Sequence, residues 1–168
     1  GATVTALTGE EIREIYDIRA ILETAAIRAA TPRLTEAELD QAASILEASE
    51  RAEDGAAWGS HDVDFHQLVY HLESRPRLKE LISGLLRRVD RYWLIHGLML
   101  THRREFEHEH RELLDALRGR DPNRAALLLE RHLTGASELL IAELVKGAPP
   151  ADGDQPAARD QQPTPHAK

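Results

Sequence analysis

The sequence predicts an all-α protein, an antiparallel bundle of about six to seven helices. Apolar residues recur at intervals of three and four along most of the chain, and no segment alternates between apolar and polar residues with a period of two. Capping residues, Gly and Pro interrupt this pattern, so the predicted helices follow one another with short connections. Short connections place consecutive helices antiparallel.

The first two predicted helices begin with the same chemistry. Thr8 with Glu11, and Thr35 with Glu38, have the spacing of a capping box, in which each side chain accepts a hydrogen bond from the backbone N–H of the other residue. The first helix should stop at Thr31-Pro32, because Pro disfavours helical geometry in the residue before it. Its predicted apolar face is Ile12, Ile15, Ile18, Leu22, Ala25 and Ala26.

The third predicted helix begins after Asp54-Gly55 and ends near Ser74. Pro76 suits the first turn of the fourth helix, where its missing N–H has no helical partner to lose. The apolar face of that helix is predicted to be Leu78, Leu81, Ile82, Leu85, Val89 and Trp93.

The helical pattern weakens over residues 97–101 and resumes from about Arg104 to Arg118. Asp121 as the cap and Pro122 at the first position then begin the last helix, which should stop at Gly147. Residues 148–168 are rich in Pro, Asp, Gln and Ala, and they predict a disordered tail because they cannot bury enough apolar surface. One helical domain is therefore expected over 8–147, preceded by a linker remnant at 1–7.

Composition limits the partners. The 168 residues carry a formal charge of −8, are 42% hydrophobic and 30% charged, and include no cysteine. These proportions are typical of a soluble globular protein, and no apolar run approaches the ~18–20 residues of a membrane span. The negative charge disfavours direct contact with nucleic-acid phosphates, while the lack of cysteine excludes thiolate metal sites and agrees with a cytoplasmic location. We expect a cytoplasmic protein that contacts neither membrane nor DNA through this chain.

Four side chains that can bind a metal lie on three of the predicted helices: Asp62, His66, His110 and His132. Asp62 and His66 are four residues apart, which places them one turn apart on one helix face, with roughly 5–6 Å between their Cβ atoms. His110 and His132 lie on apolar faces, whereas His108 shares its face with acidic residues. An inward imidazole without a partner is costly to desolvate. A shared cation would satisfy all four groups.

The predicted cofactor is therefore a divalent metal ion. A single inward histidine is more often a hydrogen-bonded core residue, but three of them with an acid one turn away favour a ligand set. Nitrogen and oxygen ligands suit zinc, nickel, cobalt or manganese. Zinc is the first candidate, although the spacing does not separate these metals.

Three separated motifs resemble the FCD domain, the C-terminal effector-binding domain of FadR-type regulators in the GntR superfamily of bacterial transcription regulators. The run from Thr8 to Glu23 resembles the first helix of that domain, and Asp62-x-x-Phe65-His66 resembles its Asp-x-x-Phe-His signature. Its closing pattern is matched by Glu107-x-x-His110-x-x-Leu113-Leu114-x-Ala116-Leu117, then Asp121, Ala125 and His132. Arg120-Asp121 departs from the Gly-Asp pair usual before the last helix.

The resemblance implies a sensor rather than an enzyme. In this family a metal held by the Asp and three His helps to bind a small carboxylate effector inside the bundle, and the domain forms a homodimer. By resemblance, Arg19 and Arg91 would bind the effector anion, although Arg19 could instead pair with Glu23 four residues later. DNA would be bound through an N-terminal winged helix-turn-helix not present in this chain, which is then either a fragment or a stand-alone domain.

Two other readings are kept open. His61-Asp62 could be the His-Asp dyad of an HD-type phosphohydrolase, which is also all-α and metal-dependent. That pattern requires a histidine upstream of the dyad, and the sequence has none before His61. A helical interaction module without a ligand also fits the composition, but it leaves the inward histidines unexplained.

Overall fold

The computed structural model describes residues 7–95 and 97–147, except for the side chains of residues 91, 94, 95 and 99. Within these ranges the chain is helical and contains no strand, which confirms the all-α prediction. The helices are α1 (Gly9–Ala30), η1 (Thr31–Arg33), α2 (Glu36–Glu50), α3 (Gly55–Val69), η2 (Leu72–Ser74), α4 (Pro76–Ile95), α5 (Leu98–Thr101), α6 (Arg103–Arg118) and α7 (Pro122–Gly147). None of the described helices is both long enough and apolar enough to span a membrane.

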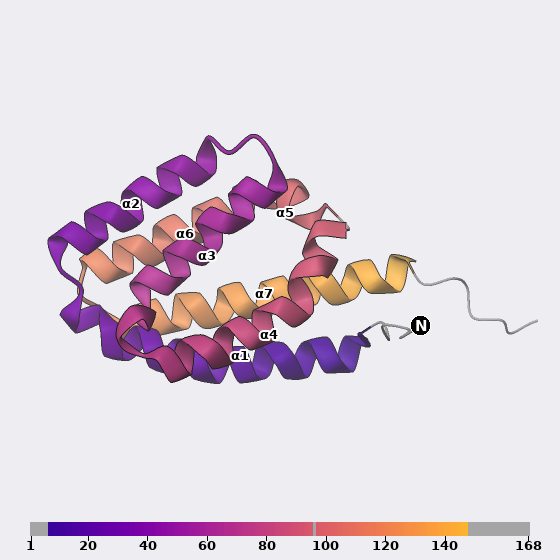
Figure 1. Cartoon of the computed structure of the whole chain (residues 1–168), viewed down its shortest axis with the longest axis horizontal. Helices are drawn as coiled ribbons and strands as arrows, with labels where there is room; N and C mark the ends of the chain where they lie inside the picture. Colours follow the sequence, from indigo (N-terminus) through magenta and orange to yellow (C-terminus); the bar gives the residue numbers. More distant parts are fainter. Residues whose placement is uncertain (1–6, 96, 148–168) are drawn as a thin grey trace, which may run out of the picture.

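The two longest helices, α1 and α7, lie side by side along one edge of the bundle (Figure 1). They run antiparallel: Gly9 at the start of α1 lies against Ile141 near the end of α7, and Arg120 just before α7 donates a hydrogen bond to the carbonyl of Thr31. Helix α6 packs on α7 and α2, α2 packs on α3, and α4 packs on α1. This arrangement encloses a space to which α1, α3, α4, α6 and α7 all contribute side chains.

The helix starts follow the local chemistry predicted from the sequence. Both capping boxes form, with Thr8 and Thr35 each accepting from the N–H three residues later and donating their own N–H to the Glu carboxylate. The Asp54 side chain accepts from the N–H of Ala57 to cap α3. Asp121 accepts from two N–H groups in the first turn of α7.

The end of α3 differs from the prediction. Instead of continuing towards Ser74, α3 ends at Val69, and His71 adopts a left-handed backbone conformation with φ of 54° before a short 3-10 helix begins. The break turns the chain so that Leu72 enters the core. Helical periodicity alone could not show it, because Leu72 packs inward on either path.

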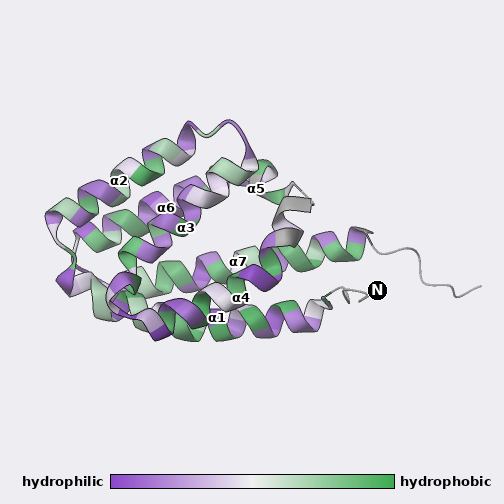
Figure 2. Cartoon of the chain, in the orientation of Figure 1, coloured by the Kyte–Doolittle hydropathy of each residue, from purple (hydrophilic) through white to green (hydrophobic). Residues whose placement is uncertain are grey.

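Hydrophilic and hydrophobic residues alternate along the helices, as expected when one face of each helix is buried (Figure 2). Three predicted core residues are exceptions. Leu81 on α4 is 57% exposed and Ile18 on α1 is 39% exposed, and Ala25 on α1 is also exposed, so the prediction that they face the core is wrong. Ile21, one turn from Ile18, is exposed as well. These side chains lie on helices that pack against each other, on the outer side of the bundle.

Loss of one capping box should have a modest, measurable cost. Thr35→Ala leaves the N–H of Glu38 without its side-chain partner, and we expect the free energy of unfolding to fall by about 1 kcal/mol. Thermal unfolding should show a melting temperature lower by roughly 2–4 °C. The control is Ser44→Ala, in the middle of the same helix and exposed, which should change little. An equal effect from both variants would contradict the capping role.

Candidate metal and effector site

Helices α3, α6 and α7 bring the four predicted metal ligands together. Asp62 and His66 project from α3, His110 from α6 and His132 from α7. The Nε2 atoms of His66 and His110 lie 3.2 Å apart, and Asp62 Oδ1 lies 3.2 Å from His110 Nε2 and 3.6 Å from His66 Nε2. Ligand atoms of the three histidines all lie within 4.8 Å of one another.

These separations fit a coordination sphere. With bonds of ~2.0–2.2 Å to His nitrogen and carboxylate oxygen, neighbouring ligand atoms of a tetrahedral site are roughly 3.3 Å apart. The spacings around His110 are therefore those that one cation at the centre of the cluster would need. Without a cation, facing nitrogen lone pairs at this distance would repel each other unless one ring carries a proton between them.

The cluster is buried among aromatic rings. His66 and His132 are each 9% exposed and His110 is 2% exposed. The His110 ring lies 5.2 Å from the ring of Phe65 and stacks on Trp58 at 6.3 Å, measured between ring centres. Aromatic rings do not solvate a charge as water does, so this burial disfavours the charged forms of the histidines and of Asp62.

Burial is the main cause of each pKa shift in the cluster. Desolvation, reinforced by the neighbouring histidines, holds the pKa values of His66 and His110 well below 6.5. Both imidazoles are therefore neutral at pH 7, the form that coordinates metals. Desolvation also raises the pKa of Asp62 to about 6, against the opposing influence of His132 and Arg19. A cation in the cluster would stabilise the ionised carboxylate.

Two further side chains hold the histidine rings from behind. The Tyr70 hydroxyl lies 2.8 Å from His66 Nδ1, and Glu109 Oε2 lies 2.7 Å from His132 Nδ1. Because the Glu109 carboxylate accepts, His132 Nδ1 carries a proton, and in the neutral imidazole this leaves the lone pair on Nε2. Such outer hydrogen bonds orient imidazole ligands and fix their tautomer.

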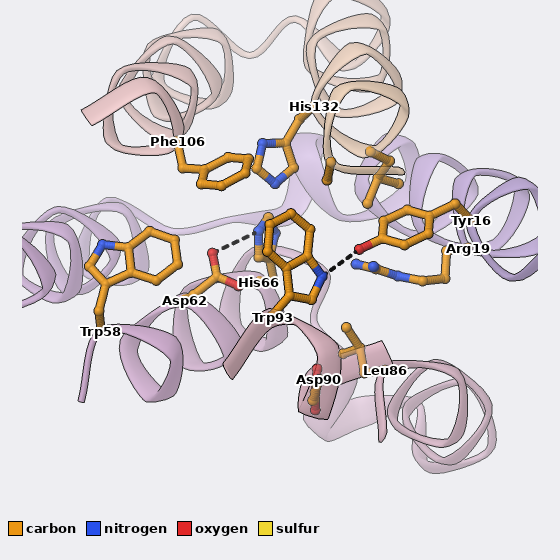
Figure 3. A pocket seen from close by; sticks show the side chains of 12 residues that line it. Tyr16, Arg19, Trp58, Asp62, His66, Leu86, Asp90, Trp93, Phe106 and His132 are labelled. Atoms are coloured by element: carbon orange, nitrogen blue, oxygen red, sulfur yellow. Dashed lines mark hydrogen bonds and ion pairs between the residues drawn. The ribbon is translucent and has the colours of Figure 1, made fainter. Parts of the chain in front are cut away.

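A cavity of about 50 Å³ opens beside the cluster, several times the ~10–15 Å³ that a single water requires. Figure 3 shows Asp62, His66 and His132 on one side of it and Arg19 on another. The remaining walls come from both apolar and polar residues of α1, α3, α4, α6 and α7: Tyr16, Trp58, Leu86, Asp90, Trp93, Phe106, Leu133 and Ala136. The space suits a small polar molecule.

Arg19 of α1 lines this cavity and also contacts Glu23 and Tyr16. Its Nε donates to Glu23 Oε1 at 2.7 Å, and its guanidinium carbon lies 4.6 Å from the centre of the Tyr16 ring. The i, i+4 ion pair that the spacing allowed is thus present, but it is buried rather than on the surface. Burial alone would lower the pKa of Arg19, yet the nearby Glu23 carboxylate raises it, so Arg19 stays charged.

Some functional positions were not singled out from the sequence. Glu23, Tyr70 and Glu109 support the site, and Asp90 of α4 lines the cavity with a pKa raised by partial burial. Glu23 could have been found, because it shares the inward face of α1 with Arg19. The side chain of the other predicted anion-binding residue, Arg91, lies outside the described part of the chain.

The pKa shifts predict how the metal-free protein responds to acid. His66 and His110 bind protons less readily when folded, so the free energy of unfolding should fall as pH drops below about 6.5. Asp62 acts in the opposite sense: its raised pKa makes the folded state bind more protons between about 6 and 3.8, which stabilises it as pH falls. The melting temperature, measured with chelator from pH 7.5 to 5, should therefore fall more steeply in Asp62→Asn. Identical profiles would contradict this assignment.

Comparison with known proteins identifies relatives over most of the described chain. Residues 14–135 match the FCD domain family. The HTH-type transcriptional repressor NanR of Citrobacter rodentium (strain ICC168) is 31% identical over 134 residues, which are 75% of this chain and 50% of that protein. NanR of Escherichia coli (strain K12) is 28% identical over 134 residues, covering 75% of this chain and 49% of that protein. The chain thus spans about half the length of these curated relatives.

Solved structures of transcription regulators share the fold. E. coli McbR/YncC superposes with a TM-score of 0.76 at 25% identity, over 84% of this chain and 73% of that chain. A GntR family member from Pseudomonas syringae pv. tomato str. DC3000 gives a TM-score of 0.71 at 26% identity, over 87% of this chain and 62% of that chain. The matched proteins are regulators rather than enzymes, as the sequence predicted, and they give the phosphohydrolase reading no support. The chain belongs to the FCD domain family found in GntR-type transcription regulators.

Proposed function

We propose that this chain is the ligand-sensing, dimerising effector-binding domain of a cytoplasmic GntR/FadR-type regulator, and that it binds a divalent metal together with a small carboxylate. One observation carries the proposal: an acid and three histidines converge at metal-ligand spacing beside a cavity that also holds a buried arginine. The cluster and Arg19 would then bind the two ends of one anion.

Asp62, His66, His110 and His132 would hold the metal, with zinc as the first candidate and nickel, manganese or cobalt as alternatives. The bound cation would supply positive charge and an open coordination position for a carboxylate oxygen. The chain itself contributes neutral imidazoles, a buried acid and hydrogen bonds that aim the rings at a common point. These are features of a preorganised ligand set.

The arrangement favours a sensor over an HD-type hydrolase. The hydrolase reading needs His61 and Asp62 as neighbouring ligands, but Asp62 points towards His66 and His110, and His61 does not belong to the cluster of three histidines. Adjacent residues on a helix point in directions about 100° apart, so both cannot face the same ion easily. Asp62, already part of the ligand set, would not be free to act as a general base.

Charge on the cavity walls suggests which carboxylates bind. Arg19 can receive a carboxylate through its remaining N–H groups, since only its Nε is paired with Glu23. Asp90 faces the same cavity, is half-buried, and makes no hydrogen bond or ion pair with the residues that the structure describes. An acidic wall repels a second carboxylate but accepts a hydrogen bond from a hydroxyl. We therefore propose a hydroxycarboxylate in preference to an unsubstituted dicarboxylate.

Homodimerisation and DNA binding complete the proposal. The exposed Ile18 and Ile21 of α1 and Leu81 of α4 offer apolar contact area on neighbouring helices, suited to a second copy of the chain. DNA would be recognised through a winged helix-turn-helix of the regulator, because the net charge of −8 disfavours contact of this chain with DNA phosphates. Effector binding would bias helix positions and, through them, the attached DNA-binding domains.

Metal analysis tests the ligand set. The purified protein should hold one divalent ion per chain, and a hundredfold excess of metal over the dissociation constant should stabilise it by ~2.7 kcal/mol, which chelator should reverse. His110→Ala and His132→Ala should lose the ion. His108→Ala is the control, because His108 lies on the same helix as His110 with its side chain 76% exposed. Full metal content in the first two variants would show that the site is wrong.

Matched acids test the cavity. Malate and succinate differ by one hydroxyl, so with the metal-loaded protein we expect malate to bind about tenfold more tightly, the value of one hydrogen bond to a charged group. Succinamide, which is neutral, should bind less than either. Asp90→Ala should remove the preference for malate, and Arg19→Ala should weaken both acids while metal is retained. Calorimetry with Arg13→Ala, an exposed position on the same helix, provides the control. A preference for succinate would overturn the role of Asp90.

A further inference from the structure

Four buried side chains form a continuous line of hydrogen bonds from the cavity arginine to the histidine cluster. Arg19 Nε donates to Glu23 Oε1 at 2.7 Å, Tyr70 Oη lies 2.9 Å from Glu23 Oε2, and the same Oη lies 2.8 Å from His66 Nδ1. Glu23 is 1% exposed and Tyr70 is fully buried. A cavity of about 20 Å³ borders all four residues, so the line lies beside a space that could hold one water.

The direction of each hydrogen bond in this line is determined by Arg19. A guanidinium only donates, so Glu23 accepts from it, and a carboxylate paired with a cation also accepts from Tyr70. Tyr70 has a single proton and gives it to Glu23. The remaining contact of Tyr70, with His66 Nδ1, must then be one in which the imidazole N–H donates and the Tyr70 oxygen accepts. Desolvation and the adjacent Glu23 also raise the pKa of Tyr70 well above 10, so the phenol keeps its proton.

We propose that Glu23 and Tyr70 are positioning residues that fix the Nδ1–H tautomer of His66, so that its Nε2 lone pair faces Asp62 and His110 before any metal binds. The inference rests on the proposed metal site for its use, although the tautomer itself can be observed without metal. The same line joins the metal ligand on α3 to the anion-binding Arg19 on α1. A shift of Arg19 or of His66 would therefore have to be accommodated by Glu23 and Tyr70.

Glu23→Gln gives the sharpest test, because it reverses the direction of the hydrogen bonds made by Tyr70 while the side chain at position 23 keeps its shape. Arg19 still needs an acceptor, so the carbonyl of the introduced amide turns towards Arg19 and its NH2 group towards Tyr70. Tyr70 then accepts from the amide and donates to His66 Nδ1. The proton of His66 is forced onto Nε2, where it points into the cluster and blocks coordination. Tyr70→Phe removes the hydroxyl, and it should leave His66 with no preferred tautomer.

Long-range ¹H–¹⁵N correlation spectra of the imidazole groups in the metal-free full chain provide the readout. We expect a protonated Nδ1 and a bare Nε2 for His66 in the unmodified protein, the opposite in Glu23→Gln, and a mixture in Tyr70→Phe. Tyr92→Phe is the matched control: Tyr92 is also buried, its hydroxyl accepts from the N–H of Leu7, and it lies outside the line. This control should keep the original tautomer.

Zinc affinity, measured by chelator competition, gives the second readout. Both Tyr70→Phe and Glu23→Gln should bind zinc about 10–100-fold more weakly, the usual effect of losing an outer hydrogen bond to a metal ligand, while Tyr92→Phe stays within about twofold. A predominant Nε2–H tautomer in the unmodified protein would overturn the proposal, whatever its metal content. If the tautomers are as expected but the protein binds no zinc, the role of Glu23 and Tyr70 is supported and the proposed metal function is contradicted. If Tyr70→Phe fails to fold, the tautomer of the isosteric Glu23→Gln decides.

Discussion

The structure depends on the requirement that polar groups removed from water find partners. The histidine cluster and the hydrogen-bonded line behind it place three imidazoles, the carboxylates of Asp62 and Glu23, the Tyr70 phenol and the Arg19 guanidinium inside the bundle. An unpaired group of any of these kinds costs more free energy than a typical hydrogen bond returns. The Arg19–Glu23 pair satisfies two of them, Tyr70 extends the pairing to His66, and Glu109 satisfies the outer nitrogen of His132. At the centre of the cluster the Nε2 atoms of His66 and His110 and the Asp62 carboxylate face one another, and a cation is the partner that their lone pairs would accept.

This requirement also explains why the helices meet as they do. The proposed ligands come from α3, α6 and α7, and their hydrogen-bond partners Tyr70 and Glu109 come from the end of α3 and from α6. Glu23 of α1 in turn pairs with Tyr70, so four helices must keep a common register to satisfy one cluster. Tyr70 is placed by the end of α3, since it caps that helix just before the chain turns at His71. A shift of one helix by a residue would leave buried groups unpaired. The polar cluster thus selects one packing among the many that the apolar faces would allow.

The sequence predicts the parts of this architecture that depend on local chemistry. Thr8, Thr35 and Asp54 cap helices because their side chains reach N–H groups only three residues away, and helical phase alone distinguishes His110 from His108. It does not predict contacts between helices. Tyr70 and Glu23 are 47 residues apart, and nothing in either neighbourhood shows that α1 will lie against the end of α3. For the same reason periodicity assigns Leu81 to the core, because it cannot tell which apolar positions another helix will cover.

A sensor must do more than bind, since a ligand shifts an equilibrium only by its difference in affinity for two states. The proposed site would meet this condition in a specific way. The proposed anion-binding residue, Arg19, is on α1 and the proposed metal ligands are on α3, α6 and α7, so an anion that touches both would be sensitive to the separation of these helices. Glu23 and Tyr70 make that separation costly to change in the absence of ligand, because movement of α1 away from α3 would break the buried hydrogen bond between Tyr70 and Glu23. An effector that draws Arg19 towards the cluster would strengthen this contact, and one too large for the cavity would strain it. The two outcomes favour different positions of α1, the helix that packs against both α4 and α7 and would transmit the change.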